Sequence, residues 1–201
     1  MLLFFYLKKE KIKRERKSYI YEKENSIIAD EELIRIAEDF IIKSKIFDLD
    51  DLLFDYVKPA MYVEDGEKEK IERYEVNFQK KPLEGFDGYV GSQLGISVEI
   101  GCNGVIIGFV SFDRDIETTG MEYPSKNIDE IKNDIIRDKN VMLDFEENVD
   151  EAEFSDVKYV LYCDSVLEKQ KYAVPHYEMI DEDNKVVAVL PAIEDKYLTI
   201  K

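Results

Sequence analysis

The chain has very few of the residues that most often perform covalent chemistry. Among its 201 residues are a single histidine, His176, two cysteines and no tryptophan. Nucleophilic catalysis by Ser, Cys or Thr needs a neighbouring base, and that base is most often an imidazole. A Cys–His pair that uses His176 stays open, but a lone histidine in a strand-like sequence is usually structural. The chain is therefore predicted not to be an enzyme.

Motifs for binding metals and phosphates are also missing. The acids at 48–55 invite comparison with an EF-hand loop, but such a loop needs Gly and Glu where this chain has Leu53 and Pro59. The glycines at 85–95 are not followed by the Gly-Lys-Ser/Thr of a phosphate loop. The acidic segment 146–156 is typical of a solvated loop. No metal and no cofactor are predicted.

The two cysteines, Cys102 and Cys163, have neither metal-ligand spacing nor a Cys-x-x-Cys arrangement. They lie at loosely comparable places in the two halves of the chain, near the ends of expected strands. Two free thiols are the simpler expectation, and one disulfide stays open if the protein is exported.

The apolar run at residues 1–7 is too short to cross a membrane, which needs about 20 residues. Basic residues follow this run, whereas a secretory signal has them before it. Residues 1–26 are predicted to form an apolar stub and a basic stalk. The stub is either a short strand or the end of a membrane anchor whose beginning is missing from this chain.

The net charge of −17 is unevenly distributed. Residues 1–17 contain seven basic and two acidic side chains, so this segment carries +5 and the remainder −22. An acidic body repels nucleic acid, which excludes that class of partner. The acidity suits either high solubility or a basic protein partner. The 45% hydrophobic content, with 13 Tyr and 11 Phe, predicts a globular chain.

The hydrophobic pattern changes from helical to strand-like twice. Apolar residues at spacings of three and four predict a helix after Asp30, over residues 30–42, and a short helical stretch at 49–56 that ends at Pro59. Asp30 is expected to cap the first of these helices. Period-two patterns and an Asn103-Gly104 turn then predict strands. These expected strands cover residues 61–63, 74–78, 96–100 and 105–112.

A second helix is predicted from Asn127, because Glu130 lies three residues later and completes a capping box. Further strands are expected at 141–143, 157–162, 171–180 and 185–193, with a turn at 181–184. The pattern predicts an α+β fold of two tandem units, each an α-helix packed on an antiparallel β-sheet. The predicted domains are the stub and stalk at 1–26, a first unit at 27–120 and a second unit at 121–201.

The strands at 159–162, 172–179 and 186–193 resemble the ending of PepSY-type domains, in which an aromatic strand is followed by an Asp/Asn-rich turn and a strand ending in Ala-Ile. Residues 94–100 with Asn103-Gly104-Val105 resemble the middle hairpin of that family. In its overall plan, the chain is similar to the YycI and YycH type of accessory protein, which regulates a membrane histidine kinase.

The resemblance implies a non-catalytic, protein-binding regulatory module on the extracytoplasmic side of the cell membrane, with a histidine kinase or a peptidase as partner. The alternative is an acidic intracellular immunity or inhibitor protein in the cytoplasm that neutralises a basic toxin. In either case the partner should carry a basic face. The predicted contact is the strand at 171–180, with Tyr172, His176 and Tyr177.

Overall fold

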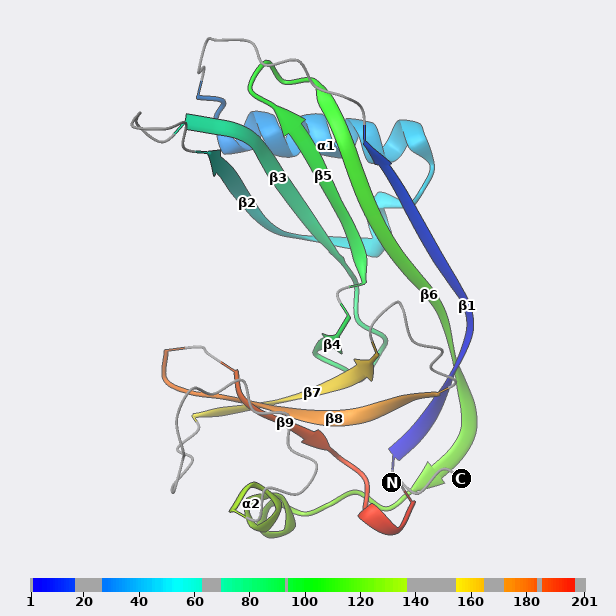
Figure 1. Cartoon of the computed structure of the whole chain (residues 1–201). Coiled ribbons are helices and arrows are strands. Elements are labelled where there is room, and N and C mark those ends of the chain that lie inside the picture. Colours follow the sequence, from blue (N-terminus) through cyan, green and yellow to red (C-terminus); the bar gives the residue numbers. More distant parts are fainter. Residues whose placement is uncertain are drawn as a thin grey trace. The chain divides into compact units, whose positions relative to one another are not determined.

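The structure is a computed structural model that describes residues 2–16, 27–62, 70–92, 94–136, 155–164, 172–183 and 186–197 (Figure 1). These residues form mostly β-structure, with nine strands and two α-helices. The elements in chain order are β1 (Leu2–Arg16), α1 (Asp30–Ser44), the 3-10 turn η1 (Leu49–Asp51), β2 (Leu52–Tyr62), β3 (Lys70–Lys80), β4 (Gly88–Gly91), β5 (Gly95–Gly101), β6 (Ile106–Tyr123), α2 (Ile128–Ile136), β7 (Asp156–Cys163), β8 (Tyr172–Ile180), β9 (Val186–Pro191) and η2 (Asp195–Tyr197).

The predicted α+β fold of two tandem helix-on-sheet units is wrong. The described residues form a mostly β protein with two sheets and only one long helix, α1. Two segments account for much of the difference, because β1 replaces part of the expected stalk and β2 replaces the helical stretch expected at 49–56. In β2, pairing with β3 along the whole strand overrides the local helical spacing. Pro59 lies within this strand, at the edge of the sheet, where its missing N–H is tolerated.

The chain divides into two compact units, each built from separate stretches. The first, here called the α1 unit, combines Glu10–Lys81 with Gln93–Arg114. The second, called the C-terminal unit, combines Met1–Lys9, Pro82–Ser92 and Asp115–Lys201. The predicted boundaries after residues 26 and 120 instead divide the chain into consecutive segments.

The α1 unit is an antiparallel sheet in the order β2-β3-β5-β6, with α1 packed on one face (Figure 1). Leu33, Ala37 and Ile41 are completely buried on the sheet-facing side of α1. Their partners on the sheet include Val76, Phe78, Ile96, Val98, Ile100 and Phe109. The helix at 30–42 is thus confirmed, but the first residue within it is Asp30, and Ala29 occupies the cap position without a side-chain hydrogen bond.

The predicted hairpin at 96–112 is confirmed, since β5 and β6 pair antiparallel around the Asn103-Gly104 turn. Gly104 has a φ of 76°, which glycine adopts without strain. The Asn103 side-chain oxygen accepts a hydrogen bond of 3.1 Å from the Val105 N–H. Local turn chemistry therefore sets this hairpin.

The C-terminal unit contains a sheet in which β8 lies between β7 and β9, and β4 pairs with β7 in parallel. Strand β1 pairs with β8 at its start, with Phe5 opposite Ala173. The short helix α2 contributes Ile131 to a small core with Met179, Ala188 and Leu190. The strands expected at 157–162, 171–180 and 185–193 are thus present, whereas residues 141–143 lie outside the described residues.

The predicted capping box of α2 is confirmed. The Asn127 side-chain oxygen accepts hydrogen bonds of 3.0 Å from the N–H groups of Asp129 and Glu130. The Glu130 carboxylate accepts one of 2.7 Å from the Asn127 N–H. These bonds satisfy N–H groups that a helix start leaves without an internal partner.

Within the described ranges, no helix combines the length and the apolar character needed to span a membrane. Cys102 and Cys163 are both buried thiols, and no disulfide joins them.

Candidate functional site

An exposed apolar surface runs along strand β2. Four of its large side chains are 40–48% exposed, and they are Leu53, Phe54, Tyr56 and Met61. We call this surface, together with the backbone of Leu52–Tyr62, the β2 edge. Exposed apolar side chains gathered on one strand are typical of an interaction surface.

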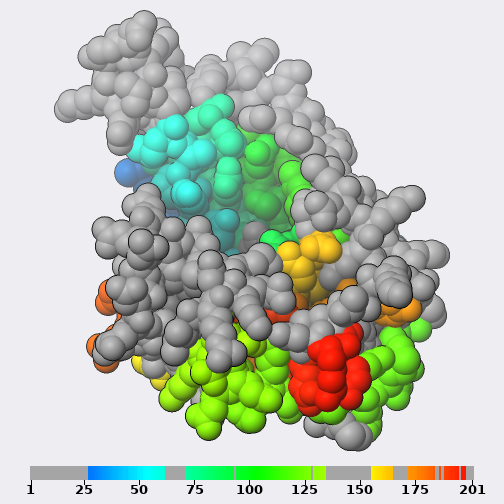
Figure 2. Space-filling view, turned by 60° about the horizontal axis from the view of Figure 1, so that its bottom comes forward, coloured from blue at the N-terminus to red at the C-terminus, as the bar shows by residue number. Residues whose placement is uncertain are grey.

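The sheet order explains why these side chains are exposed. Strand β2 lies at one end of the order and pairs with β3 on one side, from Leu52 opposite Lys80 to Tyr62 opposite Lys70 (Figure 1). In the space-filling view, the cyan atoms of this region are uncovered on the face turned toward the viewer (Figure 2). An edge strand offers backbone groups as well as side chains to a partner.

Apolar side chains occupy both faces of this edge. Phe54 lies opposite Phe78 on the face that α1 covers, and the two rings meet edge to face with centroids 5.9 Å apart. Leu53 and Tyr56 lie opposite Gln79 and Asn77, on the face away from α1. A partner that covered one face alone would leave the other half of this surface in water.

The β2 edge has an irregularity at Asp55, where β2 contains one residue more than β3 between Phe54 and Tyr56. The Asp55 carboxylate accepts hydrogen bonds of 3.1 Å from the side chain of Asn77 and 2.8 Å from that of Gln79. A negative charge is therefore fixed in the middle of the apolar surface.

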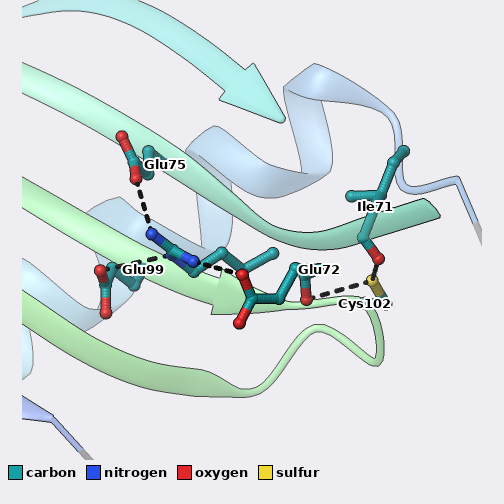
Figure 3. A network of polar contacts seen from close by, with 6 residues as sticks. Ile71, Glu72, Glu75, Glu99 and Cys102 are labelled. Carbon is teal, nitrogen blue, oxygen red and sulfur yellow. Dashed lines mark hydrogen bonds and ion pairs between the residues drawn. The ribbon is translucent and has the colours of Figure 1, made fainter. Parts of the chain in front are cut away.

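Further carboxylates lie on the neighbouring strands β3 and β5. Arg73 on β3 lies 2.7 Å from Glu72, 3.3 Å from Glu75 and 3.4 Å from Glu99, so one guanidinium faces three carboxylates (Figure 3). Burial, followed by the negative charges of Glu75 and Asp55, raises the pKa of the Tyr56 hydroxyl. The surface next to the β2 edge is thus acidic, and a basic partner would complement it.

The thiol of Cys102 lies beside this network and is not activated. Its Sγ donates a hydrogen bond of 3.1 Å to the backbone oxygen of Ile71 (Figure 3). Burial raises the pKa of the thiol, which disfavours the thiolate that a nucleophile needs. The geometry around Cys102 therefore offers no nucleophile for a Cys–His pair.

The three residues predicted to bind a partner lie on β8, which is an interior strand paired with β7 and β9. Tyr172 is half-buried and lies opposite Tyr6 of β1. His176 is buried, with its ring centroid 4.9 Å from that of Tyr162. Tyr177 points to the opposite face and packs against Tyr159. The strand is not exposed as the sequence interpretation assumed, and the role of these residues in binding stays a prediction.

The surroundings of His176 fit a structural role. Burial lowers the pKa of the imidazole to about 4, so the ring is neutral near pH 7. Its Nδ1 lies 2.9 Å from the backbone oxygen of Val174, which suits a ring that donates from this nitrogen. A neutral ring that is held by a backbone oxygen and packed on Tyr162 is typical of a structural histidine.

Sequence reasoning did not find the β2 edge, because Leu49, Leu52, Leu53 and Tyr56 have helical spacing. A signal for a strand was present in the three aromatic residues and the β-branched Val57 between positions 54 and 62. Comparisons with protein-family models, with curated proteins and with solved structures each found no match. Among the residues that the structure describes, no group of His, Cys, Asp and Glu side chains could hold a metal ion.

The buried imidazole predicts a specific pH dependence of stability. In the unfolded chain His176 has its ordinary pKa of 6.5, and in the folded chain burial lowers the value to about 4. As the pH falls below 6.5 the unfolded chain binds the proton first, so stability is lost between pH 6.5 and 4. The free energy of unfolding should fall by about 2 kcal/mol between pH 7 and pH 5.

Urea denaturation of the wild type and of His176→Gln at both pH values measures this effect. His176 is the only histidine of the chain, so the variant should lose most of the pH dependence in this window. Burial raises the pKa of Glu178, so this residue stabilises the folded state as the pH falls, opposite to His176. Glu178 is present in both proteins, so its effect cancels in the comparison. Equal pH dependence in the two proteins would show that this imidazole is not buried in its neutral form.

Proposed function

We propose that this chain is a non-catalytic protein-binding module that binds a partner with a basic face through the β2 edge. The observation that carries the proposal is the exposure of apolar side chains on both faces of one edge strand, beside an acidic surface. Apolar contacts at the centre would give the complex its stability, and the surrounding charges would steer association.

A narrower form of the proposal is a regulatory role of PepSY or YycI type on the extracytoplasmic side of the membrane, with a histidine kinase or a peptidase as partner. Its support is the sequence pattern of residues 94–105 and 159–193. The second candidate is an intracellular immunity protein that covers a basic toxin. The charge of −17 and the Arg73 group with its three carboxylates favour this candidate.

The test is affinity capture from the native host, followed by measurement of the dissociation constant for the captured protein. The double variant Leu53→Lys with Tyr56→Lys replaces two exposed apolar groups by positive charges on the face away from α1. We expect it to weaken binding of a basic partner at least tenfold, because contacts are lost and like charges meet.

Ile42→Lys is the matched control, since Ile42 is 56% exposed on α1 and lies outside the β2 edge. It should bind as the wild type does, and thermal unfolding should confirm that both variants are folded. Association should slow as the salt concentration rises. Capture of no specific protein, or equal loss of binding in the control, would contradict the proposal. The identity of a specific partner, a kinase or peptidase against a toxin, distinguishes the two candidates.

A further inference from the structure

We propose that the β2 edge is completed by an extended strand of the partner, one that combines apolar residues with basic ones. This inference rests on the proposed function and specifies how the partner binds. Strand addition uses the backbone of an exposed sheet edge for hydrogen bonds and the flanking side chains for selectivity.

The exposure of the β2 side chains favours a strand over a helix or a loop. On one side, each β2 side chain is covered by its neighbours on β3. On the other side it is exposed, where a further strand of the sheet would lie. Leu53 and Tyr56 are 47% and 40% exposed on one face, and Phe54 is 48% exposed on the other. An added strand would place side chains beside both sets at once.

Charges along the same edge favour basic residues in the added strand. Asp50 and Asp51 are exposed immediately before β2, and Asp55 is exposed within it. Lys58 is the only basic residue of β2. A second copy of this chain fits poorly, because pairing two β2 edges would bring the acidic groups of both copies onto one ribbon.

Two features make the edge selective. The extra residue at Asp55 interrupts the regular spacing, and Pro59 has no N–H to offer. A second irregularity lies between Ala60 and Met61, so the longest regular parts in which every residue has an N–H are Leu52 to Phe54 and Tyr56 to Lys58. Such interruptions prevent indiscriminate pairing of an edge strand. The partner strand must therefore match short paired segments that are separated by irregular positions.

The experiment uses the full chain and a synthetic octapeptide that alternates valine with lysine and threonine. Titration gives its dissociation constant, and amide hydrogen exchange followed by NMR gives the protection of each strand. Within Tyr56 to Lys58 we expect slower exchange of the amides that point away from β3, and no change in β5, which is already paired on both sides. Asp50→Asn with Asp51→Asn should weaken binding at least threefold.

Two control peptides separate the possible outcomes. A peptide of the same length and charge with proline at its centre should bind at least tenfold more weakly, and one with glutamate in place of lysine should not bind. Equal binding of the proline peptide would overturn strand addition and leave the proposed function intact, since side chains alone would then hold the partner. Absence of protection in β2 would also overturn the inference, as would dimerisation of the chain through β2 in sedimentation experiments.

Discussion

Asp134→Ala is expected to lower the free energy of unfolding by about 3–5 kcal/mol. Asp134 on α2 forms an ion pair of 2.7 Å with Lys126, whose side chain is only 4% exposed. Without the carboxylate of Asp134, the buried ammonium of Lys126 loses the negative charge with which it pairs. Breaking one side of a buried pair costs much more than losing an exposed one.

Urea denaturation of three variants tests this expectation. The double variant Lys126→Met with Asp134→Leu should recover most of the loss, because it replaces the whole pair by apolar groups of similar size. Glu194→Gln should leave the urea midpoint nearly unchanged, since it removes only an ion pair with the exposed Lys196. If Asp134→Ala behaved like Glu194→Gln, Lys126 would not be buried as the structure describes.

The Lys126–Asp134 pair also bears on the chemistry of the C-terminal unit. The positive charge of Lys126 contributes to lowering the pKa of His176, after the larger effect of burial. This unit therefore contains a buried lysine and a buried histidine, together with the partly buried Asp134. Each of these groups has a partner inside the unit, because Lys126 pairs with Asp134, and His176 lies against the backbone oxygen of Val174 and the ring of Tyr162.

The parts of the fold that sequence reasoning predicted are those specified by neighbouring residues. The amphipathic spacing around Leu33, Ala37 and Ile41 predicts α1, and Asn127 with Glu130 predicts the start of α2. Asn103-Gly104 predicts the β5–β6 turn. Each of these signals depends on contacts within a few positions along the chain.

The parts that were wrong depend on contacts between distant residues. Residues 49–56 have helical spacing, yet β3 offers them a paired strand from Lys70 to Lys80. The glycine-rich residues 85–95, where no strand was predicted, include β4, which forms by pairing in parallel with β7. The location of the candidate site also depends on distant contacts. Only the order of strands in the sheet makes β2 an edge strand and β8 an interior strand. Local periodicity does not contain this information.

Gly95→Ala is expected to destabilise the α1 unit by about 3–5 kcal/mol. Gly95 has a φ of 141°, and a Cβ atom built on it would lie 2.1 Å from the backbone oxygen of Phe78 on β3. Because that neighbour is backbone rather than a flexible side chain, β3 and β5 would have to separate where Gln79 pairs with Gly95. Strand β3 supports the β2 edge directly, so partner binding should weaken together with stability.

Gly104→Ala is the control in the same unit. Gly104 also has a positive φ, of 76°. A Cβ atom added there would meet only side-chain carbons, one of Ile36 at 3.5 Å and one of Ile28 at 4.0 Å. We expect a loss of about 1 kcal/mol there, from the left-handed backbone alone. Thermal and urea unfolding of both variants, with amide exchange in β2 and β3, measure the difference. Equal losses would mean that the close approach of β5 to Phe78 does not exist, and that the support of the β2 edge has another geometry.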